Sequence, residues 1–82
     1  MQLMINFKPA EGAIVRILGL IERRGFILRD LAVCDEHTDG SLTVHLEPRD
    51  QARQLDVLAR QVGRLLDVKS VSIGTSMAGP YA

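Results

Sequence analysis

The chain is poor in residues on which several large classes of protein depend. It has one cysteine, two phenylalanines, one tyrosine and no tryptophan, and ten basic side chains are balanced by ten acidic ones. A single cysteine cannot form an internal disulfide, and low cysteine content is typical of the reducing cytosol. We therefore expect a cytoplasmic protein whose core is held together by aliphatic packing.

The zero net charge, the few aromatic residues and the short apolar runs argue against two kinds of partner. Nucleic-acid-binding domains normally carry a surplus of Lys and Arg, and single-strand binders add aromatic rings on which bases stack. The formal net charge here is zero. No segment approaches the ~20 apolar residues that cross a bilayer, and the first residues lack the pattern of a signal peptide. We expect no nucleic-acid partner and no membrane partner.

Apolar residues make up 46% of the chain and follow regular patterns. Residues 2–8 and 42–47 alternate between apolar and polar, which is the period of a half-buried strand. Residues 26–35 form another strand, in which the alternation slips near Arg29 and Asp30 and predicts a β-bulge. The segment 36–40 is a hairpin loop in which Gly40 follows an aspartate and supplies the turn chemistry. A fourth strand covers about residues 68–74, with Val71 and Ile73 on its inner face.

Two amphipathic helices lie between these strands. The first ends at Gly25, and its apolar stripe consists of Ile14, Ile17, Leu18 and Ile21. The second follows Asp50, a candidate N-cap, and places Gln54 and Gln61 on its solvent side. Its apolar stripe consists of Leu55, Leu58, Ala59, Val62 and Leu65.

The element order β-α-β-β-α-β predicts one α+β domain over residues 1–74, followed by a flexible C-terminal tail at 75–82. With right-handed crossovers, the expected architecture is a ferredoxin-like sandwich: a four-stranded antiparallel sheet with two helices on one face. The second and fourth strands are then outermost. The open face would carry a mixed surface suited to a reversible contact, formed by Met4, Asn6, Thr43 and His45.

This arrangement resembles the ACT domain, and specifically the short regulatory (small) subunit of acetolactate synthase, which lacks a second domain. The resemblance covers roughly residues 3–73 and rests on the segments Arg16-Ile17-Leu18-Gly19-Leu20-Ile21, Arg23-Arg24-Gly25-Phe26, Leu65-Leu66-Asp67-Val68 and Val71-Ser72-Ile73. It implies a non-catalytic subunit that binds and activates the catalytic large subunit in branched-chain amino-acid biosynthesis. Thiamine diphosphate, magnesium and flavin would belong to that partner, and this chain would hold no cofactor.

The same resemblance suggests an amino-acid effector position at Gly12, Ala13 and Ile27. In valine-responsive relatives an asparagine precedes the glycine and a second follows the Gly-aromatic pair, whereas this chain has Pro9 and Ile27 there. Proline lacks a backbone N–H and isoleucine lacks a polar side-chain atom, so buried ligand groups would be left unsatisfied at about 1–3 kcal/mol each. We expect insensitivity to valine. Gly12 is equally well explained as a ligand contact or as a loop glycine needed for its backbone angle.

The second strand would be a long apolar edge, which invites aggregation unless another chain covers it. ACT domains commonly pair side by side through such an edge. We therefore expect a homodimer with residues 25–33 near the contact, and the dimer or partner interface is assigned to Arg24, Phe26, Ile27, Leu28 and Leu31.

Other functions are less well supported. A stand-alone ACT-type amino-acid sensor that controls another enzyme is the main alternative. A ferredoxin-like RNA- or metal-binding module is disfavoured by the zero net charge and the missing Cys-x-x-Cys pair. Cys34, His37 and His45 match no zinc spacing. Ser41, His45 and Asp39 lack the enclosed pocket that a nucleophile needs, so we expect no catalysis by this chain.

Overall fold

The elements of the structure follow the order expected from the sequence. The computed structural model describes residues 1–35, 39–50, 52 and 54–74. Its elements are β1 (Gln2–Phe7), α1 (Ala13–Arg23), β2 (Phe26–Asp35), β3 (Gly40–Pro48), α2 (Leu55–Val62) and β4 (Val68–Gly74). The expected tail at 75–82 and the hairpin residues 36–38 lie outside the described residues.

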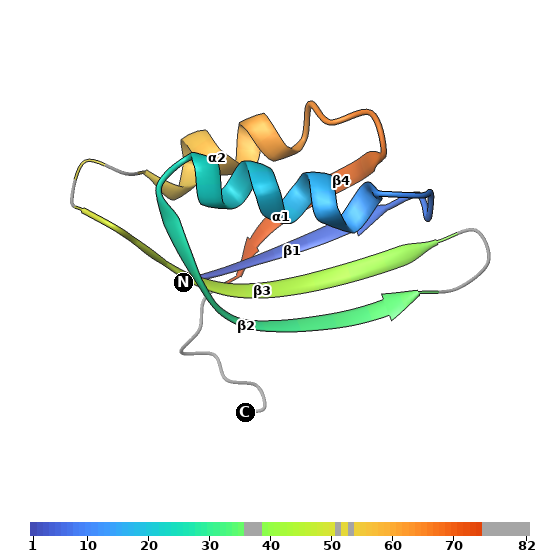
Figure 1. The fold of residues 1–82 in the computed structure, drawn as a ribbon, viewed down its shortest axis with the longest axis horizontal. Helices are drawn as coiled ribbons and strands as arrows, with labels where there is room; N and C mark the ends of the chain where they lie inside the picture. Colours follow the sequence, from blue (N-terminus) through green and yellow to red (C-terminus); the bar gives the residue numbers. More distant parts are fainter. Residues whose placement is uncertain (36–38, 51, 53, 75–82) are drawn as a thin grey trace.

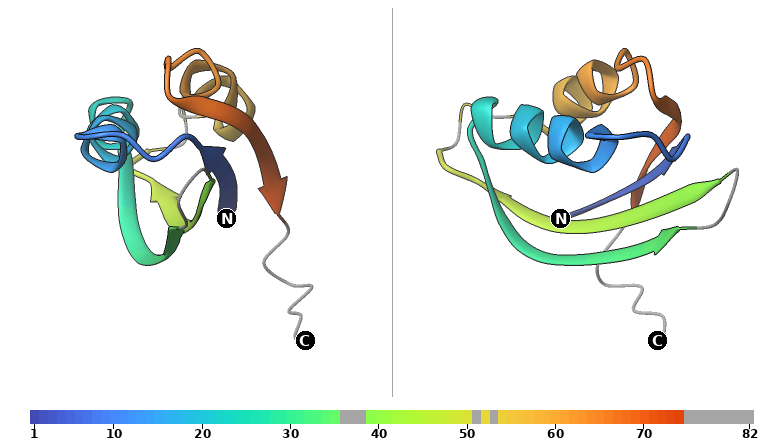
Figure 2. Two further views of the ribbon diagram at one scale, coloured as in Figure 1. Left: turned by 90° about the vertical axis from the view of Figure 1, so that its right-hand side faces the viewer. Right: turned by 45° about the vertical axis from the view of Figure 1, so that its right-hand side comes forward.

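The four strands form one antiparallel sheet in the order β2-β3-β1-β4. Figure 1 shows α1 and α2 together above the sheet, and both views in Figure 2 keep the two helices on that one side. The ferredoxin-like α+β fold is therefore confirmed, with β2 and β4 at the edges.

The core lies between the sheet and the two helices and is almost entirely aliphatic. Leu3, Ile5 and Phe7 alternate along β1 and are at most 1% exposed. Burying a side chain of this size stabilises the fold by about 1.5–3 kcal/mol. The other hydrophobic residues of the strands and helices that are at most 2% exposed are Ala13, Ile17, Ile21, Phe26, Leu42, Val44, Leu46, Leu58 and Val62.

The outer face of the sheet carries the polar half of each alternation. Met4 pairs with Thr43 and Asn6 pairs with Ser41. Because side chains alternate along a strand, these four lie on the face of the sheet that points away from the buried residues. Asn6 Nδ2 donates a hydrogen bond to Ser70 Oγ at 3.0 Å across the β1–β4 pair. The mixed open face expected from the sequence is thus present, and no helix of the described residues covers it.

The bulge expected in the second strand is also present. The register of β2 against β3 shifts between Leu28 and Asp30. Leu28 pairs with the buried Leu46 before the shift, and Leu31 pairs with the buried Val44 after it. The extra residue therefore returns the apolar side chains of β2 to the helix side of the sheet.

α1 sits on the sheet through a stripe slightly different from the one expected. Ile17 and Ile21 are fully buried as predicted, whereas Ile14 and Leu18 are only partly buried against the core. Leu20, which lay outside the predicted stripe, is 7% exposed. The side of α1 that carries Leu20 therefore faces the core more than the predicted stripe indicated. The C-terminal turn of the helix is more deeply buried than the sequence pattern predicted.

α2 starts later than the sequence predicted. Its N-cap is Gln54, which makes no side-chain capping bond, so the assignment of Asp50 as the cap is wrong. Asp50 Oδ1 instead accepts a hydrogen bond from Ala52 N at 2.9 Å. Aspartate side chains commonly close turns in this way, two residues along their own backbone.

α2 also ends earlier than predicted. The helix stops at Val62, and Leu65 lies in the turn that follows, where its N–H donates to the Val62 carbonyl at 3.0 Å. Leu65 still packs against the core. The prediction that Leu65 packs with the apolar stripe was correct, but the prediction that it lies in the helix was wrong.

Gly40 has a different purpose from the one that its neighbouring aspartate suggested. It lies in β3 opposite Phe7, and a positive φ is found only at Gly12 and Gly25 among the described glycines. A Cβ atom on Gly40 would lie 2.5 Å from Phe7 Cζ. The turn interpretation is therefore wrong, and glycine is needed because a buried ring stands directly over this backbone.

Candidate effector and interface sites

The β1–α1 connection holds two of the three residues assigned to an effector. Gly12 has a φ of 80°, a conformation that glycine adopts without strain, and its carbonyl accepts a hydrogen bond from Arg16 N at 2.9 Å. Ala13 is 1% exposed. With Phe7 and Pro9 these residues line a shallow hollow of about 120 Å³. Its lining is mostly apolar.

Arg16 ties this connection to the turn between α2 and β4. Its guanidinium pairs with the Asp67 carboxylate, with Nε at 3.2 Å from Oδ2, and donates to the Glu11 carbonyl at 3.2 Å. A Cβ atom on Gly12 would lie 2.9 Å from Arg16 Nη1. Gly12 therefore has a structural purpose through its backbone angle and through its closeness to this ion pair.

The third effector residue, Ile27, lies at the other end of α1. Gly12 precedes the helix and Ile27 follows it, and an 11-residue helix is about 16 Å long. Ile27 pairs with Glu47 and is half-buried. Within one copy of the chain the structure does not bring the assigned effector residues together.

Four of the five residues assigned to an interface lie at the start and middle of β2, and the fifth, Arg24, precedes the strand. Leu31 is 41% exposed, while Ile27 and Leu28 are half-buried. Phe26 is only 2% exposed and belongs to the core of its own copy, so its backbone alone is available at the sheet edge. Arg24 is exposed at the C-cap of α1.

One ion pair crosses from the edge strand to its neighbour. Arg29 Nη2 lies 2.9 Å from Glu47 Oε1, and both side chains are more than half exposed. The hydrogen bond from Arg29 and the attraction of its charge lower the pKa of Glu47 below its ordinary value. The same bond raises the pKa of Arg29.

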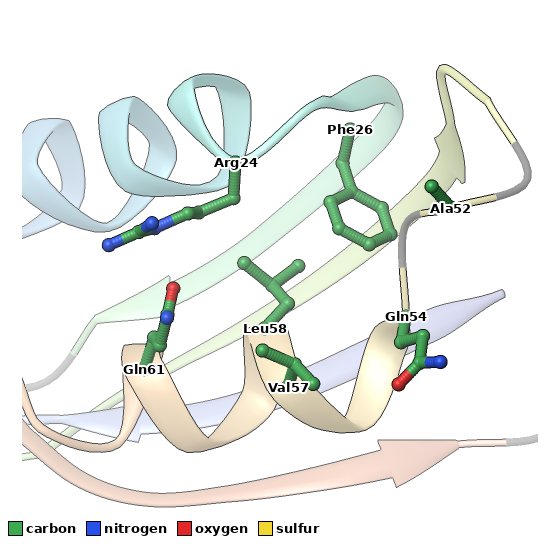
Figure 3. Close-up of a pocket in the computed structure, with 7 residues that line it drawn as sticks. All are labelled: Arg24, Phe26, Ala52, Gln54, Val57, Leu58 and Gln61. Carbon is green, nitrogen blue, oxygen red and sulfur yellow. The ribbon is translucent and has the colours of Figure 1, made fainter.

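A second hollow, of about 180 Å³, opens between the C-terminal end of α1 and α2 (Figure 3). Arg24, Phe26, Gln54, Val57, Leu58 and Gln61 line it. The sequence placed Gln61 on the solvent side of its helix, but its Oε1 atom is buried and accepts no hydrogen bond from the described residues. Sequence reasoning gave no signal for this hollow, because its two walls come from separate helices.

The residues considered for metal or catalytic chemistry are not arranged for it. In the part of the chain that the structure describes, no three His, Cys, Asp or Glu side chains gather where they could hold a metal ion. Ser41 and His45 are four residues apart along β3, about 13 Å, which is too far for a hydrogen bond. Cys34 is exposed on β2. None of the helices within the described ranges has the length and apolar character needed to cross a membrane.

Comparison with known proteins assigns the fold to a family. The family model of the ACT domain matches residues 9–71. A probable acetolactate synthase small subunit of Methanothermobacter thermautotrophicus is 31% identical over 68 residues, which are 83% of this chain and 39% of that protein. The chain thus spans well under half the length of this curated relative.

Two solved structures show the same fold at low sequence identity. The ACT domain from GTP pyrophosphokinase of Chlorobium tepidum superposes with a TM-score of 0.73 at 14% identity, covering 87% of this chain and 91% of that one. Formyltetrahydrofolate deformylase from Burkholderia mallei gives a TM-score of 0.66 at 16% identity, covering 87% of this chain and 27% of that one. With the match over residues 9–71, the chain belongs to the ACT domain family.

Proposed function

We propose that the chain is a non-catalytic regulatory subunit that binds and activates the catalytic subunit of an acetolactate synthase in branched-chain amino-acid biosynthesis. The observation that carries this proposal is the 31% identity to a probable acetolactate synthase small subunit over 83% of the chain. The thiamine diphosphate, magnesium and flavin chemistry would take place entirely in the partner. This chain would act by assembly, holding the catalytic subunits in their active arrangement.

The proposed assembly begins with a homodimer formed along β2. The outer backbone groups of an edge strand are free to pair with another strand. Leu31 and Val33 occupy inner-face positions of β2 and yet are 41% and 44% exposed. Pairing of two β2 strands would continue the sheet across the dimer. It would bring Leu31 and Val33 of one copy next to the same residues of the other copy.

A dimer would also determine whether the residues assigned to an effector can lie side by side. Gly12 and Ile27 lie beyond opposite ends of α1, so only a second copy can place one beside the other. An amino-acid effector, if the complex responds to one, would then sit between copies. Because Pro9 has no backbone N–H and Ile27 has no polar side-chain atom, we expect valine to leave the activity of the complex unchanged.

Co-purification with the acetolactate synthase catalytic subunit of the same organism tests the main proposal. We expect a stable complex and a severalfold rise in turnover when this chain is added. A catalytic subunit that neither binds the chain nor changes its turnover would reject the proposal. Adding valine to the active complex tests insensitivity, and saturable micromolar binding of valine by calorimetry would contradict it.

The dimer has its own test. Light scattering of the wild-type chain over a concentration series should give the mass of two copies, and Leu31→Lys should shift the mass towards one copy. Ile73→Lys is the matched control, because Ile73 is a 47% exposed aliphatic residue of β4, the strand at the opposite edge of the sheet. A wild-type mass of one copy at every concentration would contradict the dimer.

The alternative is a stand-alone amino-acid sensor that controls another enzyme. It is favoured by the limited coverage of the curated relative, since only 39% of that protein corresponds to this chain. Failure of the chain to bind the catalytic subunit, together with a dimeric mass, would favour this alternative.

A further inference from the structure

The backbone groups of β2, an edge strand of the sheet, alternate between pointing to β3 and pointing outward (Figure 1). The phase of this alternation is set at the far side of β3. Leu46 N donates to the Met1 carbonyl at 2.9 Å, and Met1 N donates to the Leu46 carbonyl at 3.3 Å. Because bonded and non-bonded pairs alternate between antiparallel strands, the odd-numbered residues of β3 direct their backbone groups to β2. Beyond the bulge, these residues pair with Asp30, Ala32 and Cys34.

The residues between these three, Leu31 and Val33, therefore have outward-pointing N–H and C=O groups. Their side chains lie on the helix side of the sheet and are 41% and 44% exposed. One of the outward groups is occupied, since Leu31 N donates to Asp30 Oδ1 at 2.9 Å. That bond agrees with the alternation, because an N–H directed at β3 would be bonded within the sheet. The edge thus offers two aliphatic side chains to a further strand, while the Asp30 carboxylate covers one of its donors.

A second copy of β2 matches this edge in one register. Outward groups must face outward groups, so residues whose side chains lie on the helix side face one another. Two-fold symmetry also makes the contact self-complementary. With the axis at Ala32, Leu31 of each copy lies opposite Val33 of the other. With the axis one residue away in either direction, Leu31 or Val33 lacks an aliphatic residue opposite it, and the bulge at Arg29 interrupts regular pairing before Asp30.

We propose that two copies pair through β2 in the register centred on Ala32, and that pairing displaces the Asp30 carboxylate from the Leu31 N–H. The inference rests on the dimer proposed above and specifies its geometry. Leu31 and Val33 exchange backbone hydrogen bonds across the axis, and their side chains pack together on the helix side. Ala32 lies opposite its own copy, on the open face. The helices of both copies then lie on the same side of one continuous sheet.

Asp30 opposes pairing in this arrangement, whereas Leu31 and Val33 favour it. In the single copy the Asp30 carboxylate satisfies a donor of the edge strand. In the dimer the Leu31 N–H bonds to the Val33 carbonyl of the other copy instead, and the carboxylate returns to water. Hydrogen bonds to a charged acceptor are stronger than those between neutral groups, so their loss weakens association. A charged group at a strand edge also discourages pairing with unrelated strands.

The single cysteine of the chain makes the register measurable by disulfide cross-linking. Opposite residues of a non-bonded pair have Cα atoms about 4.5 Å apart, which is within the range of a disulfide. Ala32→Cys in a Cys34→Ser background should therefore give a disulfide-linked dimer on mild oxidation, read on a non-reducing denaturing gel. Wild-type Cys34 is the matched control, because it is exposed on the same strand. It lies opposite Asp30, about 13 Å along the strand from its own copy, and should not cross-link.

Substitution of Asp30 tests the displacement step. Asp30→Ala should lower the dissociation constant of the dimer by about tenfold, because one carboxylate bond in each copy no longer has to be broken. Asp30→Asn is the matched control, since its amide oxygen can still accept from Leu31 N, and it should change the constant by no more than about threefold. Sedimentation equilibrium measures the constants, and circular dichroism checks that each variant remains folded.

Four results would overturn the proposal. The first is a mass of one copy for the wild-type chain at every concentration. The second is a cross-link through wild-type Cys34 but not through Ala32→Cys, which would reject the register and leave the dimer standing. The third is an Asp30→Ala dimer no tighter than the wild type, and the fourth is an Asp30→Asn dimer as tight as that of Asp30→Ala. None of these results bears on binding to the catalytic subunit, which co-purification tests separately.

Discussion

The two ends of α1 are built from similar parts and use them differently. Each end has a glycine with positive φ, 80° at Gly12 and 89° at Gly25, and each has an arginine within one turn of the helix end. At the N-terminal end, Arg16 reaches across to Asp67, whose side chain is only 15% exposed. At the C-terminal end, Arg24 borders a hollow and forms no ion pair within the described residues.

The difference shows which of the two arginines contributes to the stability of the fold. The Arg16 pair joins residues 51 positions apart and fixes the α2–β4 turn against the start of α1. The backbone repeats this connection, since Lys8 N donates to the Asp67 carbonyl at 2.7 Å. An arginine with a nearly buried carboxylate partner stabilises the fold, whereas an exposed arginine without such a partner contributes little to its stability.

Substitution of the two glycines should give the largest losses of stability. Gly12→Ala should lower the free energy of unfolding by about 2–3 kcal/mol, because the positive φ is strained for alanine and the new Cβ displaces Arg16. Gly25→Ala carries only the backbone strain, about 1–2 kcal/mol. Urea unfolding with an unchanged m-value measures both. Equal losses in the two variants would show that the Arg16 contact contributes nothing at the N-terminal end.

The two arginine substitutions should change the free energy of unfolding by less than the glycine substitutions do. They nevertheless compare the two ends of α1 directly. Arg16→Met should cost about 1 kcal/mol, since the pair is half exposed on the arginine side and screened by water. Arg24→Met should change stability by no more than about 0.5 kcal/mol. A double-mutant cycle of Arg16→Met with Asp67→Asn separates their coupling from other effects. A greater loss from Arg24→Met would reverse the roles assigned to the two ends.

The features predicted correctly from the sequence depend on local periodicity and chain topology. Alternation along β1 placed Leu3, Ile5 and Phe7 in the core, and a slip in the alternation located the bulge at Arg29 and Asp30. The strand order followed from right-handed crossovers. The alternation and its slip lie within single segments of about ten residues, and the crossover rule needs only the order of the elements. All three can therefore be applied without knowing which side chains pack together.

The features that the sequence did not predict depend on contacts between distant segments. Gly40 resembled a turn residue because of its neighbour, but its requirement comes from the ring of Phe7. Gln61 resembled a solvated helix residue, but the end of α1 approaches it and buries its oxygen. The capping interpretation of Asp50 failed because an aspartate closes an early turn as readily as it caps a helix.

The Arg29–Glu47 pair gives the smallest expected effect and serves as an exposed reference for the Arg16 pair. Because the pKa of Glu47 is lowered in the folded chain, the pair stabilises the fold above the ordinary carboxyl pKa. This contribution is lost as the pH falls through the lowered pKa and Glu47 becomes protonated. Arg29→Gln should therefore be slightly less stable than wild type at neutral pH and equally stable in acid, as measured by thermal unfolding over a pH series. Glu47→Gln should show the same loss at neutral pH, and a difference from wild type that grows towards acid pH would contradict the lowered pKa of this carboxylate.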